Sequence, residues 1–184
     1  MRPILFYTIG YPGAGKTTLA KSLSGWLDAA HLQADRIGFE LFRLPRYSVE
    51  ERQIVHEVMQ QRAAESLQLG RHVLYDASNN TYEQRSQLVA LAEYNKSQAI
   101  GLWLQTPIET AKQRAAKVRD RELTFPVARV IPPHIFDQYV AAFESPMIEE
   151  NVLRIAGDAN FHLQYRRLQR QMRGRNLTLP RAVQ

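Results

Sequence analysis

Apolar residues recur along the chain in two alternating patterns. Short runs of β-branched, aromatic and aliphatic residues are typical of buried strands, and they occupy residues 3–9, 31–34, 72–75, 99–104 and 152–156. Longer segments with apolar residues at helical spacing predict helices over 15–28, 36–43, 48–69, 81–93, from 107 onward, 132–143 and 160–173. Strands that alternate with helices in this way predict a parallel sheet with right-handed crossovers.

The predicted strand ends indicate where a ligand binds. In open parallel sheets, ligands bind beside the carboxyl ends of the strands. Three chemically distinctive features directly follow predicted strands, namely a glycine-rich segment at residues 10–15, Asp35 and Asp76. The sequence therefore predicts that all three lie at one edge of the sheet.

The first of these features matches the phosphate-binding pattern G-x-x-x-x-G-K-[ST]. Its glycines let the backbone bring N–H groups close to phosphate oxygens, and the next helix adds the positive end of its dipole. We expect Lys16 to reach the β- and γ-phosphates and the Thr17 hydroxyl to ligate Mg²⁺. The sequence thus predicts a site for ATP and Mg²⁺ formed by Gly10, Tyr11, Pro12, Gly13, Ala14, Gly15, Lys16, Thr17 and Thr18.

Composition adds a size limit and an uneven charge. The chain has 184 residues, 45% of them hydrophobic, which is typical of one globular domain. It has no cysteine, which excludes disulfides and thiolate chemistry. No apolar run is long enough to span a membrane, so we expect a soluble cytoplasmic protein. Residues 151–184 carry the whole net charge of +6, with seven arginines and a single acid, Asp158.

The two strand-end carboxylates support different roles. Asp76 follows a four-residue apolar strand, which favours a Mg²⁺ ligand opposite Thr17 over a simple cap for the next turn. Asp35 supports two interpretations equally. It is either the base that takes the proton of an acceptor hydroxyl or the N-cap of the helix at 36–43.

Four passages resemble the zeta-toxin / polynucleotide-kinase-like P-loop kinases, small kinases with an AAA-type ATP-binding domain that phosphorylate hydroxyl groups. The passages are residues 10–18, residues 34–36, residues 70–81 with Arg85, and residues 143–146 with Glu149. Together they span about residues 3–150. The resemblance implies an α/β P-loop fold of three layers, α/β/α, around a five-stranded parallel sheet in the order 2-3-1-4-5. Apart from the resemblance, the length of the chain predicts a single domain over residues 1–175, and we expect a flexible tail over 176–184.

The resemblance assigns further roles. It implies that Asp35 is the general base, and that the acceptor is bound by Asp35, Arg36, Asp76, Asn79 and Arg85. It also implies a lid over about residues 114–130, whose arginines stabilise the transferring phosphoryl group. Arg114 and Arg119 are favoured over Arg121, and a solvated basic helix face is the alternative. The family often has an arginine where this chain has Gly38, so either Arg36 or Arg43 replaces it or this substrate contact is absent.

The C-terminal helix is rich in arginine, with five arginines in the ten positions 166–175. Such a face could bind nucleic acid. A solvated helix face is favoured, because no recognised nucleic-acid module accompanies it.

Together these features predict an ATP- and Mg²⁺-dependent kinase. It would transfer the γ-phosphoryl group to a hydroxyl of a small molecule, a nucleotide sugar or a nucleic-acid 5′ end, with Lys16, Asp35, Arg114 and Arg119 as catalytic residues. The alternative is a regulatory or nucleic-acid-associated ATPase that has no phosphoryl acceptor, in which Asp35 only caps a helix.

Overall fold

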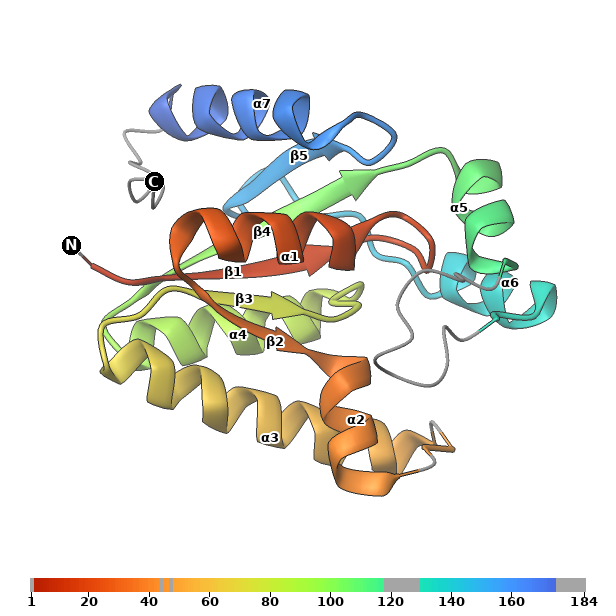
Figure 1. Cartoon of the computed structure of the whole chain (residues 1–184), viewed down its shortest axis with the longest axis horizontal. Helices are drawn as coiled ribbons and strands as arrows, with labels where there is room; N and C mark the ends of the chain where they lie inside the picture. The colour runs from red at the N-terminus through yellow and green to blue at the C-terminus, as the bar shows by residue number, and fades with distance from the viewer. Residues whose placement is uncertain (1, 44, 47, 118–129, 175–184) are drawn as a thin grey trace.

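The computed structural model of the chain describes residues 2–43, 45–46, 48–117 and 130–174. At its centre lies a sheet formed by β1 (Ile4–Ile9), β2 (Ala30–Gln33), β3 (Val73–Asp76), β4 (Gln98–Gln105) and β5 (Val152–Ala156). Every pairing is parallel, and the order is β2-β3-β1-β4-β5 (Figure 1). The predicted fold class and strand order are therefore confirmed.

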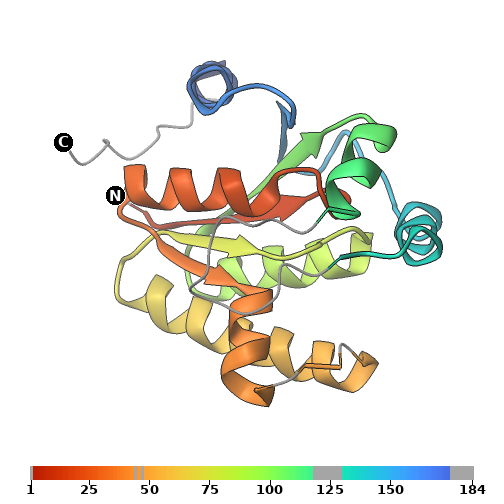
Figure 2. The same ribbon diagram turned by 45° about the vertical axis from the view of Figure 1, so that its right-hand side comes forward.

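Helices cover both faces of this sheet. Within the described residues they are α1 (Lys16–Leu27), α2 (Ala34–Phe42), α3 (Val49–Gln68), α4 (Tyr82–Tyr94), α5 (Ile108–Ala115), α6 (Pro133–Ala141) and α7 (Phe161–Gly174). Helices α1 and α7 lie on one face and α3 and α4 on the other, whereas α5 and α6 lie beyond the carboxyl ends of the strands (Figures 1 and 2). This arrangement gives the predicted three layers.

The central strands are buried on both faces, and β1 is buried along its whole length. On one face Phe6 belongs to a core cluster with Leu23 of α1 and Leu168 of α7. On the other face Leu5 belongs to a cluster with Met59 of α3. Because both faces are packed, the carboxyl ends of β1 and β3 are held firmly, and the loops that leave them start from fixed positions.

The start of α2 differs from the prediction. Strand β2 ends at Gln33 and α2 begins at Ala34, so Asp35 lies in the first turn of the helix and not at a strand end. The N-cap is Gln33, and its side chain makes no capping hydrogen bond. The alternative interpretation of Asp35 as an N-cap is therefore wrong.

Two predicted segments lie wholly or partly outside the described residues. The first is the lid over 114–130, of which the structure describes the end of α5 but not Arg119 or Arg121. The second is the tail over 176–184.

Helix α7 packs on the sheet through Tyr165, Leu168 and Met172, and the Trp26 ring of α1 contacts the Tyr165 ring in a tilted arrangement with centroids 4.7 Å apart. Its arginines at 166, 167, 170 and 173 are exposed. A nucleic-acid role for them stays a prediction. None of the helices that the structure describes has both the length and the hydropathy needed to cross a bilayer.

Candidate functional site

The glycine loop joins β1 to α1 and passes close to α5. Gly10, Gly13 and Gly15 all have positive φ angles, of 144°, 78° and 99°. A Cβ at residue 13 would lie 2.2 Å from the carbonyl oxygen of Ala111, so only glycine fits there. No side chain caps the start of α1, and its first N–H groups are therefore available to an anion.

The loop is anchored by the segment that follows β3. The Asn80 side-chain oxygen accepts a hydrogen bond from the N–H of Gly10 at 3.0 Å. Asn79 donates to the Thr8 carbonyl oxygen at 2.9 Å, and the Thr8 hydroxyl donates to the Ala77 carbonyl oxygen at 2.8 Å. The partners of these hydrogen bonds are more than nine-tenths buried, namely Thr8, Ala77, Asn79 and Asn80. These asparagines therefore fix the end of β1 and the start of the loop.

Replacing Asn80 by alanine should loosen this anchor. The variant leaves the buried N–H of Gly10 without its acceptor, so we expect a loss of about 1–3 kcal/mol in the free energy of unfolding and weaker nucleotide binding. Urea denaturation and titration with a fluorescent ATP analogue measure the two effects. The control is Asn95→Ala, which removes an asparagine bonded to Leu91 at the far end of α4. If N80A bound nucleotide as tightly as N95A, the anchoring role would be contradicted.

Lys16 is the first residue of α1, and its ammonium group turns back onto the loop. It donates to the carbonyl oxygens of Gly10 and Tyr11 at 2.9 and 3.0 Å. Burial lowers the pKa of Lys16, and the charges of Asp76 and Asp35 raise it. Burial has the larger effect, and the pKa falls to about 8. The lysine is therefore held beside the loop, where an entering phosphate would offer it a charged partner in place of two carbonyl groups.

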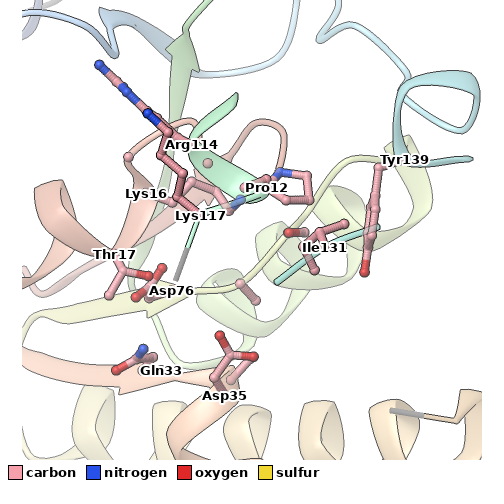
Figure 3. A pocket seen from close by; sticks show the side chains of 16 residues that line it. Pro12, Lys16, Thr17, Gln33, Asp35, Asp76, Arg114, Lys117, Ile131 and Tyr139 are labelled. Atoms are coloured by element: carbon pink, nitrogen blue, oxygen red, sulfur yellow. The ribbon is translucent and has the colours of Figure 1, made fainter. Parts of the chain in front are cut away.

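Two oxygen groups suited to a divalent cation lie next to each other in the close-up, the Thr17 hydroxyl and the Asp76 carboxylate (Figure 3). Asp76 is 3% exposed, and its Oδ2 lies 3.1 Å from Nε2 of His31 on β2. The imidazole thus orients the carboxylate at the end of β3. A hydroxyl and a carboxylate, completed by phosphate oxygens and water, form a ligand set that Mg²⁺ prefers, so the residues present fit this ion.

A cavity of about 260 Å³ opens beside the loop. Of the predicted site residues, those that line it are Pro12, Gly13, Gly15, Lys16, Thr17, Asp35, Asp76 and Arg114. Asp35 faces this space from the first turn of α2, across from Asp76 and Thr17 (Figure 3). The structure therefore brings the loop, the predicted metal ligands and the predicted base to one cavity, as the strand order requires.

A second cavity, of about 180 Å³, adjoins the first on the side of α2 and α3. The two share five lining residues, Ala34, Asp35, Ala77, Ser78 and Tyr139. Asp35 therefore lies at the boundary between a space beside the glycine loop and a separate space that the loop does not reach.

Several predicted site residues lie elsewhere. Those that line neither cavity are Gly10, Tyr11, Ala14, Thr18, Arg36, Asn79 and Arg85. The Tyr11 ring packs on Phe143, with centroids 4.9 Å apart, and Arg36 pairs with Glu40 on the helix surface. Arg85 is 1% exposed and forms an ion pair with Glu150 at 2.6 Å. The structure thus gives Asn79 and Arg85 contacts within the fold.

Arg114 is the predicted lid arginine that the structure describes. Its guanidinium donates to the carbonyl oxygen of Gly157 at 3.2 Å. In Figure 3 its side chain points away from Asp35 and Asp76, although the residue lines the cavity. Lys117, two residues beyond the end of α5, lines the same cavity.

Sequence reasoning missed His31, Asn80 and Tyr139. His31 had no visible signal, because its partner Asp76 is 45 positions away. Asn80 adjoins a capping box, Thr81 with Gln84, that the pattern Thr-x-x-Gln could have revealed. Tyr139 lies on α6, whose position over the cavities depends on the fold.

A parallel sheet of this order, with a glycine loop between its first strand and first helix, defines a P-loop α/β protein. A family model for the AAA domain matches residues 5–146, more than half of the chain. The chain therefore belongs to the AAA domain family. No curated protein matches its sequence.

Solved structures with this fold include several kinases. A sugar kinase from Janibacter sp. HTCC2649 superposes with a TM-score of 0.64 at 16% identity, covering 100% of this chain and 99% of that one. A gluconokinase from Sinorhizobium meliloti 1021 gives 0.66 at 12% identity, covering 95% and 97%. The Mycobacterium tuberculosis APS kinase, solved with AMPPNP and APS, gives 0.66 at 15% identity, covering 94% and 98%. These similarities establish the fold over nearly the whole chain.

Proposed function

We propose that this protein is a kinase that transfers the γ-phosphoryl group of ATP to a hydroxyl group of a small molecule. The observation that carries the proposal is the position of Asp35 at the boundary of two adjoining cavities. One cavity contains the phosphate-binding loop, and the other has room for a second substrate. An ATPase that uses only water needs no second cavity of this kind.

The chain's own residues support a direct transfer. The loop N–H groups and Lys16 hold the phosphates of the donor, and Thr17 and Asp76 hold Mg²⁺, which neutralises charge on the phosphate oxygens when bound. Asp35 accepts the proton of the acceptor hydroxyl as that oxygen forms its bond to the γ-phosphorus. The bond from the γ-phosphorus to the bridging oxygen breaks, and ADP leaves with that oxygen.

The arginine that stabilises the transferring group is part of the proposal. Arg114 would exchange its contact with the Gly157 carbonyl for phosphate oxygens, which are stronger acceptors for a guanidinium. Arg119 keeps the same proposed role.

The likeness to zeta-toxin / polynucleotide-kinase-like enzymes supports the same reaction class. The names of the structural neighbours do so too, since they include a sugar kinase and a gluconokinase. Among the acceptors that the resemblance allows, the volume of the second cavity favours a small molecule over a nucleotide sugar or a nucleic-acid end.

Turnover in the presence and absence of acceptors tests the proposal. With labelled ATP and Mg²⁺ alone we expect slow hydrolysis, and with pooled small hydroxylated metabolites we expect a labelled product and faster ADP release. Oligonucleotides with free 5′ hydroxyls form a separate pool. ATP hydrolysis at the same rate with every pool, without a labelled product, would instead support the ATPase alternative.

A further inference from the structure

One cation that lines the second cavity, Arg52 of α3, forms no ion pair among the residues that the structure describes. Two neighbouring arginines of α2 and α3, Arg36 and Arg62, both pair with Glu40, at 3.2 and 2.8 Å. The charge of Arg52 is therefore available to a ligand in the cavity.

His56 lies one turn further along α3 and adds a donor. Its Nδ1 lies 3.0 Å from the hydroxyl oxygen of Tyr75, while the hydroxyl lies 3.5 Å from the His56 carbonyl oxygen. Burial raises the pKa of Tyr75, so the phenol keeps its proton, and we take the tautomer in which Nδ1 accepts that proton at the shorter contact. Burial and the charge of Arg52 lower the pKa of His56, which keeps the imidazole neutral. The remaining proton is then on Nε2, which is a hydrogen-bond donor.

Gln84 supplies another donor. Its side-chain oxygen already accepts from the N–H groups of Asn80 and Thr81, at 2.9 and 3.2 Å. The amide NH₂ is therefore the end of Gln84 that remains for a ligand in the cavity.

Two carboxylates, Asp35 and Glu51, also line this cavity. Glu51 accepts from the backbone N–H of Arg46 at 2.7 Å. Asp35 lies at the boundary with the first cavity. Besides these carboxylates and the hydroxyl groups of Ser78 and Tyr139, the polar side chains of the cavity are the donors Arg52, His56 and Gln84.

The rest of the lining limits the size and shape of the ligand. Phe42, Pro45 and Val55 give the cavity an apolar wall. Its volume of about 180 Å³ is below the roughly 300–1,000 Å³ of typical ligand pockets. A compact molecule with a short carbon skeleton fits these features.

We propose that the phosphoryl acceptor is a small hydroxylated anion, whose carboxylate or phosphate group is bound by Arg52, His56 and Gln84 while one of its hydroxyl groups reaches Asp35. Anionic oxygens, which only accept hydrogen bonds, match the three donors that α3 and Gln84 bring to this cavity. This inference rests on the proposed kinase function, because it uses Asp35 as the base that meets the acceptor.

Matched acceptors test the anionic group. Glycerol is compared with glycerate and with glycerol 3-phosphate, and sorbitol with gluconate, in the presence of ATP and Mg²⁺. We expect kcat/KM for at least one anion to exceed that of its neutral partner by about tenfold or more, as is typical of hydrogen bonds to charged groups. Glycerate and glycerol 3-phosphate distinguish a carboxylate from a phosphate.

Arg52→Met should remove this advantage and leave the KM for ATP unchanged. Arg52→Lys, which keeps the charge but loses the planar fork, should retain part of it. The control is Arg71→Met, which removes an exposed arginine just before β3, at the opposite end of that strand from Asp76. Equal use of neutral and anionic acceptors, or an anion preference that survives in R52M, would overturn the proposal.

A binding experiment separates this inference from the kinase function. With AMPPNP and Mg²⁺ in the donor cavity, the same anions are titrated while the imidazole NMR signal of His56 is followed, assigned with His56→Gln. A shift in the wild type that R52M abolishes supports the anion site, even if no acceptor is phosphorylated and the kinase function fails. If no anion shifts the signal, the anion site is wrong, even if neutral acceptors are phosphorylated.

Discussion

Replacing Asp35 by asparagine is expected to slow phosphoryl transfer by about 10²–10⁴-fold, the usual contribution of a general base, and to leave ATP binding close to that of the wild type. Asparagine has the shape of aspartate and can still orient a hydroxyl group, but it cannot take up a proton. Asp35 reaches both cavities from the first turn of α2, whereas the groups that we propose hold the phosphates come from the loop and α1. In this variant the rate of phosphoryl transfer should therefore fall while the affinity for ATP stays close to that of the wild type.

Single-turnover kinetics and a nucleotide titration measure the two effects of D35N. The control is Glu40→Gln, which neutralises a carboxylate on the same helix that pairs with Arg62 and lines neither cavity. E40Q should transfer at the wild-type rate. Wild-type transfer by D35N would show that Asp35 is not the base, and a parallel loss of ATP affinity would assign it to the donor side through its charge near Lys16.

Replacing Arg85 by methionine is expected to lower the free energy of unfolding by about 3–5 kcal/mol, the usual result of breaking a buried ion pair from one side. Its guanidinium binds the Glu150 carboxylate through two parallel contacts, Nε to Oε2 at 2.6 Å and Nη2 to Oε1 at 2.9 Å. It also donates to the Glu144 carbonyl oxygen at 3.0 Å. Without the guanidinium, Glu150 is left with a largely buried charge.

Urea unfolding of the single and double variants measures this effect. R85M/E150Q should recover part of the loss, because glutamine carries no charge and can still accept from the Met147 N–H as Glu150 does. If Arg85 instead binds substrate, as the family resemblance implies, R85M should raise the acceptor KM without loss of stability. The two variants thus separate a structural role from a substrate contact.

The ion pair also predicts a pH dependence. Burial raises the pKa of Glu150, but hydrogen bonds from Arg85 and from the Met147 N–H, with the charge of Arg85, bring it below its ordinary value of 4.5. The folded state therefore holds this proton less tightly than the unfolded chain. The contribution to stability is present above about pH 4.5 and is lost as the pH falls through the folded pKa. The difference in stability between the wild type and R85M should shrink over that range.

The edge of the sheet that carries the site could be predicted from local pattern. Residues 152–156 form β5 as expected, and Asp76 ends β3. Once the order of parallel strands is known, the glycine loop and Asp76 must meet, because the carboxyl ends of β1 and β3 are neighbours. Local periodicity and one topological rule were sufficient for this part of the site.

Contacts between distant segments could not be predicted. Asn80 meets Gly10 across 70 positions and Arg85 meets Glu150 across 65, and neither pairing leaves a mark on local spacing. The burial of Arg85, in contrast, could be predicted from helical spacing, because the residue lies three positions before Leu88 and seven before Ala92 on the buried face of α4. The start of α2 was missed because β2 joins it without a turn residue.

The close approach of Gly13 to α5 has a mechanical consequence. A Cβ at residue 13 would lie only 2.2 Å from the Ala111 carbonyl oxygen, so the backbone of the loop is in direct contact with the backbone of α5. Any side chain at residue 13 would therefore push the glycine loop away from the helix that carries Arg114.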